Sequence, residues 1–309
     1  MSQETNTTTK DNIGFDSKAG GNRLRTSNPD GTYNIRRKNN FFQEFHIYQW
    51  AITCKWRTYW AVVLAIYVSV NFIFASLYFL IGPDYIVGIE GDEYSRFWQC
   101  YFFSLQTFTT VGYGGLHPKG LMTNTLAGFE AFLGLMTFAL ATGALYGRFS
   151  KPEARIKYSA NALISPFKDG NALMLMLCNN KKGNLLEVSA KMTLSWLDDV
   201  DGKQVRKFSS LPLDIDKISF LSLTWTLVHV LDEESPLSWF TAEDYLKRDV
   251  EIFVFLSCYD DTFAQTVHSR YAYTGAEVVH NAKFKRAFYT DDNGYTVLDV
   301  EKVGAYDLL

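Results

Sequence analysis

Three long segments with almost no charged residues lie within one window of 90 residues of this chain. Charged residues make up 20% of the sequence, yet residues 58–83 and 97–118 contain none, and residues 120–147 contain only Glu130. About 20 apolar residues suffice for a helix to cross a bilayer. Because a soluble domain does not produce three such segments in succession, this part of the chain is predicted to lie in a membrane.

The three segments differ in character. Residues 59–81 and 121–147 are rich in Val, Leu, Ile and Phe, and they predict two membrane-spanning helices. The middle segment contains Gln, Ser, three Thr and three Gly, which is too polar for contact with lipid. Non-helical backbone at membrane depth is tolerated only where protein or a water-filled path covers it. We therefore expect a half-helix followed by a re-entrant loop.

Charges at the ends of the segments predict the orientation. Basic residues flank the two spans on one side, whereas the loop after residue 83 is acidic. By the positive-inside rule both termini are cytoplasmic, and the protein is expected to be a multi-pass protein of the cell inner (plasma) membrane. Residues 1–40, rich in Thr, Asn and Gly, are predicted to be a mostly disordered cytoplasmic tail. The net charge of −3 argues against a nucleic-acid-binding protein.

From about residue 153 the pattern changes to period two. Apolar and polar residues alternate over 186–196, and further runs at 172–178, 224–230, 251–257 and 295–300 are separated by turn-rich pieces. Alternation of this kind indicates half-buried strands. Residues 153–309 are therefore predicted to form an all-β sandwich.

The motif that carries the chemistry lies in the middle segment. It consists of Thr110, Val111, Gly112, Tyr113 and Gly114, directly after an apolar-aromatic stretch. Four loops of this sequence replace the hydration shell of K⁺ with rings of backbone carbonyls, and glycines allow successive carbonyls to face one axis. The motif predicts a selectivity filter with K⁺ sites at residues 110–113, with no other cofactor and no other metal. Because one chain supplies one loop, a homotetramer is expected.

Several motifs together resemble the inwardly rectifying potassium channels, and most closely their prokaryotic, KirBac-like branch. Besides the filter, residues 101–107 resemble the pore helix of that family, residues 147–152 its junction after the second span, and residues 229–237 its HEIDExSPL motif. Residues 269–277 and Phe284 extend the similarity, which runs from about Asn22 to the C-terminus. The resemblance implies a two-span, re-entrant, tetrameric pore domain (57–152), an interfacial slide helix (41–56), and an immunoglobulin-like cytoplasmic domain. An ordinary linker helix is the alternative for residues 41–56.

Two positions depart from the family pattern. The prokaryotic branch commonly has Glu in the pore helix and Asp after the filter, where this chain has Gln106 and Gly115. The hydrogen bonds behind the filter are therefore expected to differ. A poorly selective cation pore is one alternative reading.

The second span carries the expected gate. Phe138, Thr142 and Tyr146 recur every four residues, so they share one face of a helix, and Tyr146 matches the family position where four large side chains close the pore. An aromatic anchor at the membrane interface is the alternative for Tyr146. Gly134 and Gly143 match the two glycines at which the family's inner helix bends, although close helix packing would explain them equally well.

Other charged residues suggest further sites. The resemblance implies binding of anionic lipid headgroups by a cluster that consists of Lys55, Trp56, Arg57, Arg148 and Lys151. Plain membrane topology predicts the same basic charges. Glu277 matches an acidic position on the cytoplasmic pore wall, with an ordinary surface carboxylate as the alternative. For Glu130 we expect a hydrogen bond to the backbone that supports the filter.

No enzyme is predicted, because the five histidines show no metal or nucleophile pairing and the sequence has no GxxxxGK phosphate loop. The alternative outside transport is a membrane-anchored sensor whose β-sandwich binds a ligand. The leading hypothesis is passive, potassium-selective conduction of the inward-rectifier type, gated at the inner helices and modulated by anionic lipid.

Overall fold

The computed structural model describes residues 46–200 and 203–309, together with Asn28 and Gly31. The predicted cytoplasmic tail (1–40) and the first five residues of the predicted slide helix (41–45) therefore lie outside the described residues, apart from those two positions. The chain divides into two compact units at Lys151–Pro152, and each is considered by itself.

The first unit is helical. Its elements in chain order are α2 (Ile47–Thr53), α3 (Trp56–Ile81), the 3₁₀ turn η1 (Pro83–Tyr85), β1 (Ile86–Val87), α4 (Glu93–Phe108), β2 (His117–Pro118) and α5 (Leu121–Phe149). The short strands β1 and β2 pair antiparallel and bring the two ends of the outer loop together. Both α3 and α5 are long and apolar enough to cross a membrane.

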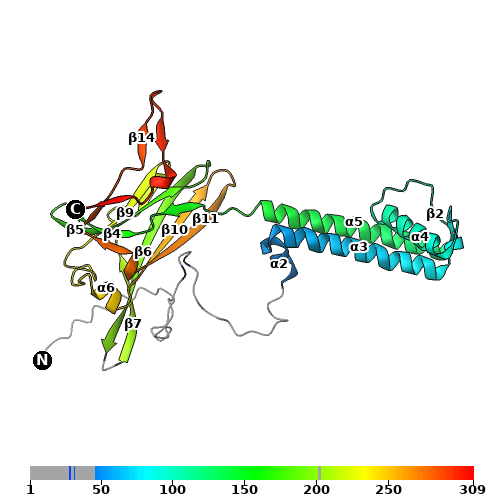
Figure 1. The fold of residues 1–309 in the computed structure, drawn as a ribbon, viewed down its shortest axis with the longest axis horizontal. Coiled ribbons are helices and arrows are strands. Elements are labelled where there is room, and N and C mark those ends of the chain that lie inside the picture. The colour runs from blue at the N-terminus through cyan, green and yellow to red at the C-terminus, as the bar shows by residue number, and fades with distance from the viewer. Residues whose placement is uncertain (1–27, 29–30, 32–45, 201–202) are drawn as a thin grey trace. The chain divides into compact units, whose positions relative to one another are not determined.

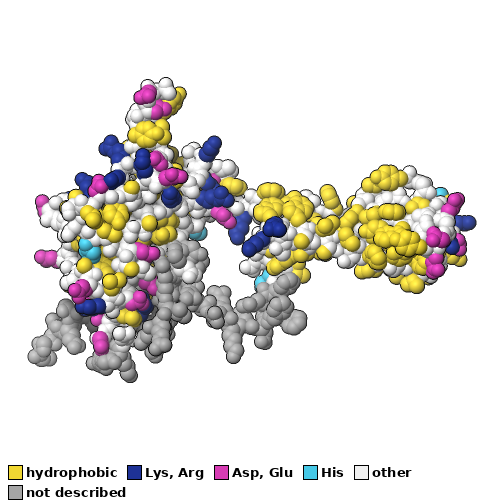
Figure 2. Space-filling view, in the orientation of Figure 1, with side chains coloured by type: hydrophobic (Ala, Val, Ile, Leu, Met, Phe, Trp, Pro, Cys, Tyr) yellow, Lys and Arg dark blue, Asp and Glu magenta, His cyan; other side chains and the backbone are white. Residues whose placement is uncertain are grey.

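Apolar side chains cover the outside of this unit. Figure 2 shows hydrophobic side chains gathered over α3 and α5, with charged side chains toward the ends of these helices. A water-soluble helix would turn such residues inward, so the distribution suits a lipid environment or contact with other chains. The long helix α3 ends where Gly82, at φ 124°, precedes Pro83.

The half-helix α4 packs between the two long helices (Figure 1). It begins at Asp92, whose side chain accepts a hydrogen bond from the backbone N–H of Ser95 at 3.3 Å. This is an N-cap that satisfies a free donor of the first turn. The contact is apolar and aromatic, built from Phe74 and Tyr78 of α3 with Cys100 and Phe103 of α4.

The second unit is a β-sandwich with two five-stranded sheets. One sheet has the order β11-β10-β6-β7 with β8 also paired to β6, and the other has the order β12-β4-β5-β3 with β9 also paired to β5. The first sheet comprises β6 (Leu185–Val200), β7 (Lys203–Leu211), β8 (Lys217–Phe220), β10 (Glu251–Asp260) and β11 (Gln265–Thr274). The second comprises β3 (Ile156–Tyr158), β4 (Ala162–Phe167), β5 (Gly170–Asn179), β9 (Thr224–Val230) and β12 (Val278–His280).

Smaller elements complete this unit. They are α6 (Asp244–Lys247), the 3₁₀ turns η2 (Gly275–Glu277) and η3 (Val300–Lys302), and the paired strands β13 (Ala282–Phe284) with β16 (Tyr306–Leu308) and β14 (Phe288–Thr290) with β15 (Thr296–Leu298).

One continuous apolar core lies between the two sheets. Leu173 and Leu175 of β5 meet Leu194 of β6 and Val254 of β10, and all four are fully buried. The predicted order, two apolar helices and then a mostly β domain, is confirmed. Within the two sheets the predicted runs match β5, β6, β9 and β10, whereas the remaining strands, β3, β4, β7, β8, β11 and β12, were not among them.

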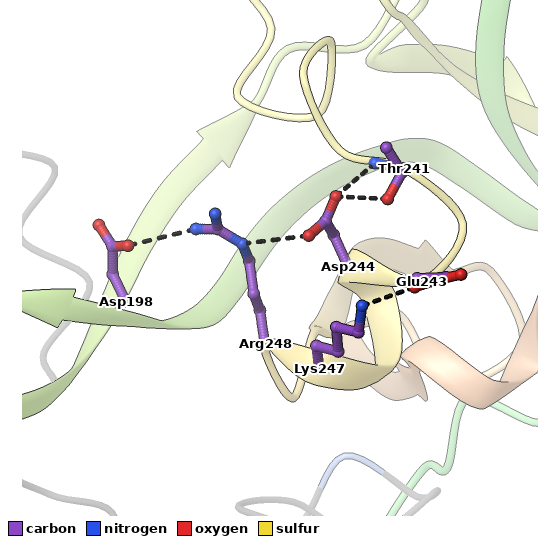
Figure 3. Close-up of polar contacts among 6 residues, drawn as sticks. All are labelled: Asp198, Thr241, Glu243, Asp244, Lys247 and Arg248. Atoms are coloured by element: carbon purple, nitrogen blue, oxygen red, sulfur yellow. Dashed lines mark hydrogen bonds and ion pairs between the residues drawn. The ribbon is translucent and has the colours of Figure 1, made fainter.

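The connection between β9 and β10 is held by ion pairs (Figure 3). Arg248 lies between Asp198, at 3.2 Å, and Asp244, at 3.6 Å, and its guanidinium is 5.1 Å from the ring centre of Trp239. Thr241 donates hydrogen bonds to Asp244 through its backbone N–H and its hydroxyl, which lowers the pKa of that carboxyl. These contacts hold α6 against the end of β6.

Candidate functional site

The loop after α4 has an alternating backbone. Thr110, Gly112 and Gly114 have positive φ angles of 58°, 55° and 85°, whereas Val111 and Tyr113 between them do not. In a strand, successive carbonyls point in opposite directions; reversing the conformation at every second residue can turn them to one side. Glycine adopts this region readily, but a β-branched threonine there is a strained exception. The sequence predicted this backbone freedom for the two glycines, but it gave no sign of the positive φ at Thr110.

Gln106 holds this loop from behind. The backbone N–H of Tyr113 donates to Oε1 of Gln106 at 3.2 Å, and Nε2 of Gln106 donates to the carbonyl of Leu116 at 3.4 Å. The side chain is buried, so these bonds satisfy an amide that would otherwise be costly. The hydrogen bonds behind the loop are therefore made by a neutral amide, with Gly115 contributing no side chain.

Glu130 does not make the expected bond to the filter-supporting backbone. One of its oxygens accepts from the hydroxyl of Tyr78 at 2.7 Å, and the other contacts the hydroxyl of Ser104. Ser104 also lies 3.1 Å from Oδ1 of Asn71. The partners of Glu130 are thus side chains of α3 and α4. Because these residues lie far from Glu130 in the sequence, no local pattern indicated the contact.

The two candidate hinge glycines lie in different surroundings. A Cβ atom on Gly134 would lie 2.0 Å from the carbonyl oxygen of Phe108, the last residue of α4. A Cβ atom on Gly143 would meet no described atom within 4 Å. Close packing against α4 therefore explains why residue 134 is a glycine, but it does not explain the glycine at position 143.

Phe138, Thr142 and Tyr146 lie along α5 as the spacing predicts, and all three are exposed in the single chain. Val111 and Tyr113 are exposed as well, Tyr113 by 86%. Large apolar side chains with this exposure are only partly covered by the residues that the structure describes.

Two apolar hollows border the same region. One, of about 650 Å³, lies beneath the end of α4 and includes Trp60, Tyr67 and Phe138 in its lining. The other, of about 540 Å³, lies beside the loop and includes Phe102 and Tyr113.

The guanidinium of Arg148 makes its contacts within its own chain. Its Nη1 and Nη2 donate to the carbonyls of Ala51 and Cys54, each at 2.6 Å, at the C-terminal end of α2. Its guanidinium carbon lies 4.5 Å from the ring centre of Trp56 and 5.0 Å from that of Tyr59. A cation at a helix C-terminus stabilises the free carbonyls there, so Arg148 fastens α2 to the end of α5. By contrast, Lys55, Arg57 and Lys151 are exposed.

In the sandwich, the carboxylate of Glu277 accepts from the backbone N–H of Thr274 at 2.7 Å and from its hydroxyl at 3.0 Å, which closes a capping box. His229 lies in β9, with Nδ1 2.7 Å from the carbonyl of Pro212 and Nε2 2.8 Å from the hydroxyl of Ser235. Burial lowers the pKa of His229. The 229–237 motif thus ties β9 to the loop that follows it.

Two known families match the chain. The family described as "Ion channel" matches residues 61–151, and that described as "Inward rectifier potassium channel C-terminal domain" matches residues 156–306. Both describe channel proteins, so the chain is not an enzyme.

Individual relatives agree with these families. The chain is 31% identical over 283 residues to the inward rectifier potassium channel Kirbac3.1 of Paramagnetospirillum magnetotacticum, with 90% of this chain and 94% of that protein covered. It is 25% identical over 303 residues to the ATP-sensitive inward rectifier potassium channel 15 of Homo sapiens and of Mus musculus, with 92% of this chain and 79% of each relative covered.

Among solved structures, the sporulation control protein Spo0M of Bacillus subtilis has a TM-score of 0.22 at 10% identity, with 44% of this chain and 59% of that chain covered, and it carries no argument about fold. The two family matches and the relatives above identify the family of this chain. The chain belongs to the inward rectifier potassium channel family.

Proposed function

We propose that this protein is a potassium-selective channel whose filter consists of residues 110–114, with K⁺ held at Thr110, Val111, Gly112 and Tyr113. The observation that carries the proposal is the alternation of positive φ at Thr110, Gly112 and Gly114, directly after the half-helix α4. A partially negative helix end favours a cation in front of it.

Four copies around one axis would complete the filter. The exposed side chains of Val111 and Tyr113 and the two open hollows beside α4 support this assembly, because a neighbouring subunit would cover them. A closed ring with cyclic symmetry is the arrangement in which one loop per chain forms a filter.

The same proposal places the pore domain before residue 152, the β-sandwich after it, and both termini in the cytoplasm at the inner (plasma) membrane. Tyr146 forms the gate, because four aromatic rings on the free stripe of α5 would make a hydrophobic constriction that dewets. Phe138 and Thr142 line the cavity above it, and Gly143 is the candidate hinge. Glu277 is the weaker candidate for a cytoplasmic pore site, since it already serves as a cap.

Anionic lipid is proposed to act through Lys55, Arg57 and Lys151, which are exposed at the cytoplasmic ends of the spans. Trp56 and Arg148 would respond indirectly, because Arg148 fastens α2 to α5 and its guanidinium packs on the ring of Trp56 at the start of α3. Flux in vesicles with and without anionic lipid tests this. The triple change of Lys55, Arg57 and Lys151 to Gln should remove the difference, and a retained difference would contradict it.

The main experiment is potassium-driven flux into liposomes that contain the purified protein, with Rb⁺ and Na⁺ as competitors and Ba²⁺ as blocker. Flux carried by K⁺ and Rb⁺, closed to Na⁺ and stopped by Ba²⁺, is expected. Equal flux of Na⁺ would indicate a poorly selective pore. Tyr146→Ala should raise the flux, and an unchanged rate would remove Tyr146 as the gate.

A matched pair of variants tests the filter itself. Gly114→Ala places a Cβ on a residue with φ 85° and should abolish selective flux. Gly115→Ala adds the same methyl group one residue later, where φ is not positive and no described atom lies within 4 Å, and should leave the flux unchanged. Equal effects of the two changes would contradict the proposed filter geometry.

A further inference from the structure

A polar cluster is buried where the three helices of the first unit meet. Asn71 and Tyr78 come from α3, Ser104 from α4 and Glu130 from α5, and the most exposed of the four, Tyr78, shows 1% of its surface. Polar groups at membrane depth must find their partners within the protein. The hydrogens of this cluster can therefore be counted.

The direction of the Asn71 amide is fixed by its neighbour. Nδ2 of Asn71 lies 2.7 Å from the backbone carbonyl of Tyr67, and a carbonyl oxygen can only accept. The amide nitrogen must face that carbonyl, so the amide oxygen Oδ1 faces Ser104.

Ser104 therefore touches two oxygens and has one hydrogen. Its hydroxyl contacts Oδ1 of Asn71 and Oε1 of Glu130. The hydroxyl hydrogen of Tyr78 is already used on Oε2 of Glu130. If Glu130 were ionised, it could accept but not donate, and one of the two contacts of Ser104 would lack a hydrogen.

Charge gives a second, independent reason. The hydrogen-bond partners of the Glu130 side chain in the described chain are the hydroxyls of Tyr78 and Ser104, neither of which is cationic. A buried carboxylate without a positive partner is strongly unfavourable. A neutral carboxylic acid removes this cost and supplies the missing hydrogen.

We propose that Glu130 is a neutral carboxylic acid that donates to Ser104 and so positions the pore helix. The hydrogen bonds then run in one direction, from Tyr78 to Glu130, from Glu130 to Ser104, from Ser104 to Asn71, and from Asn71 to the carbonyl of Tyr67. Every hydroxyl and carboxyl hydrogen of the cluster then has an acceptor. An acid kept neutral by its surroundings in order to donate a hydrogen bond is known chemistry.

The position of Ser104 links this chain of bonds to conduction, and here the inference rests on the proposed function. Ser104 precedes Gln106 by two residues on α4, and Gln106 holds the loop through Tyr113 and Leu116. Glu130 is thus a positioning residue: it fixes α4, and α4 carries Gln106, which supports the filter.

Infrared spectroscopy of the reconstituted full chain tests the protonation state without any measurement of flux. At neutral pH the wild type should show the carbonyl stretch of a protonated carboxylic acid, and Glu130→Gln should lack that band. Tyr78→Phe should shift the band to higher frequency, because it removes the hydrogen bond to the carbonyl oxygen. A wild-type spectrum without the band, or a band that persists in Glu130→Gln, would overturn the proposal.

Flux variants test the positioning role in a Tyr146→Ala background, which removes the proposed gate. Glu130→Gln retains one donor and one acceptor and should keep K⁺ over Na⁺ selectivity within about twofold of the parent, whereas Glu130→Leu leaves Ser104 and Tyr78 without their partner and should lower selectivity about tenfold. If Glu130→Leu does not assemble, Ser104→Ala replaces it, with the same expected direction.

Equal losses in the Gln and Leu variants would show that the charge is needed and would refute the proposal. Failure of the proposed function looks different. In that case the parent would carry no selective flux, while the infrared band would still be present.

Discussion

Replacing Gly134 with alanine separates packing from bending in α5. The added Cβ would lie 2.0 Å from the carbonyl oxygen of Phe108, whereas a carbon and an oxygen in ordinary contact stay about 3.3 Å apart. The end of α4 and the middle of α5 must therefore separate by about 1.3 Å. The obstacle is backbone, which cannot rotate away as a side chain can.

The cost follows from this displacement. Overpacking a well-packed interior costs about 1–3 kcal/mol, and a fixed carbonyl places Gly134→Ala near the upper end in each subunit. Because Phe108 precedes Thr110 by two residues, the same shift would reach the first residue of the proposed filter. Both the stability of the assembled protein and its selectivity should fall.

Gly143→Ala is the matched control. It introduces the same group on the same helix, where no described atom lies within 4 Å, and the change from glycine to alanine favours a helix by about 1 kcal/mol. This variant should be at least as heat-stable as the wild type, and if Gly143 is the hinge, its flux should fall without loss of selectivity.

The assay is thermal denaturation of the purified protein, with K⁺ and Na⁺ flux measured on the same preparations. A Gly134→Ala protein that denatures at the wild-type temperature with unchanged selectivity would refute the packing argument. If that protein also opened less readily, bending would be the purpose of the glycine.

Three further changes have defined outcomes. Gln106→Ala removes the two side-chain bonds behind the loop and should lower K⁺ over Na⁺ selectivity about tenfold, measured by competitive flux; unchanged selectivity would show that the Gln106 side chain is not the support. Arg148→Gln loses the charge at the end of α2 and should destabilise the protein by about 2 kcal/mol in thermal denaturation, with a wild-type midpoint as the contradicting result. Burial lowers the pKa of His229 from 6.5, so the unfolded chain binds more protons than the folded chain below that pH. The contribution of His229 to stability should be full above pH 6.5 and should fall as the pH decreases toward the lowered pKa. A denaturation midpoint that depends on pH as much in His229→Gln as in the wild type would contradict this.

The parts of the fold that could be predicted from sequence are those with local signals. Charge gaps located the two spans, because each spanning helix must be apolar along its own length. The start of α3 at Trp56 lies three residues before the predicted one, since Arg57 falls inside the helix and a charge gap cannot include it. Long basic side chains at helix ends reach the interface, so helices extend past the gaps that reveal them.

The site was less predictable because its contacts join distant residues. A search for glycine finds Gly112 and Gly114 but not Thr110, whose positive φ is imposed by the structure around it. The Gln at position 106 indicated only that the hydrogen bonds behind the loop differ from the family pattern. The sequence does not say which groups that amide contacts. The contact between Tyr78 and Glu130 spans 52 residues and has no pattern to reveal it.

Lipid binding illustrates a different limit. The basic residues near both spans suggest one cluster, because the sequence shows the charge of a side chain but not whether that side chain is already bonded within the protein. The contacts of Arg148 with Ala51, Cys54 and Trp56 show that one member of that cluster already serves its own chain.

The side-chain support behind the proposed filter is made by an uncharged amide, and this leads to a last prediction. Gln106 donates to the carbonyl of Leu116 and accepts from the N–H of Tyr113, which a carboxylate could not do because it has no hydrogen to donate. Gln106→Glu should keep both bonds only while the acid is neutral. As the pH rises and the acid ionises, the carboxylate would repel the carbonyl of Leu116, and a fixed negative charge would act on permeating ions through a low-dielectric medium. Potassium flux of the Glu variant should therefore depend on pH far more steeply than that of the wild type when the two are measured in the same liposomes. Parallel pH profiles would mean that the donor side of Gln106 contributes nothing to the filter, and that Tyr113 alone is held.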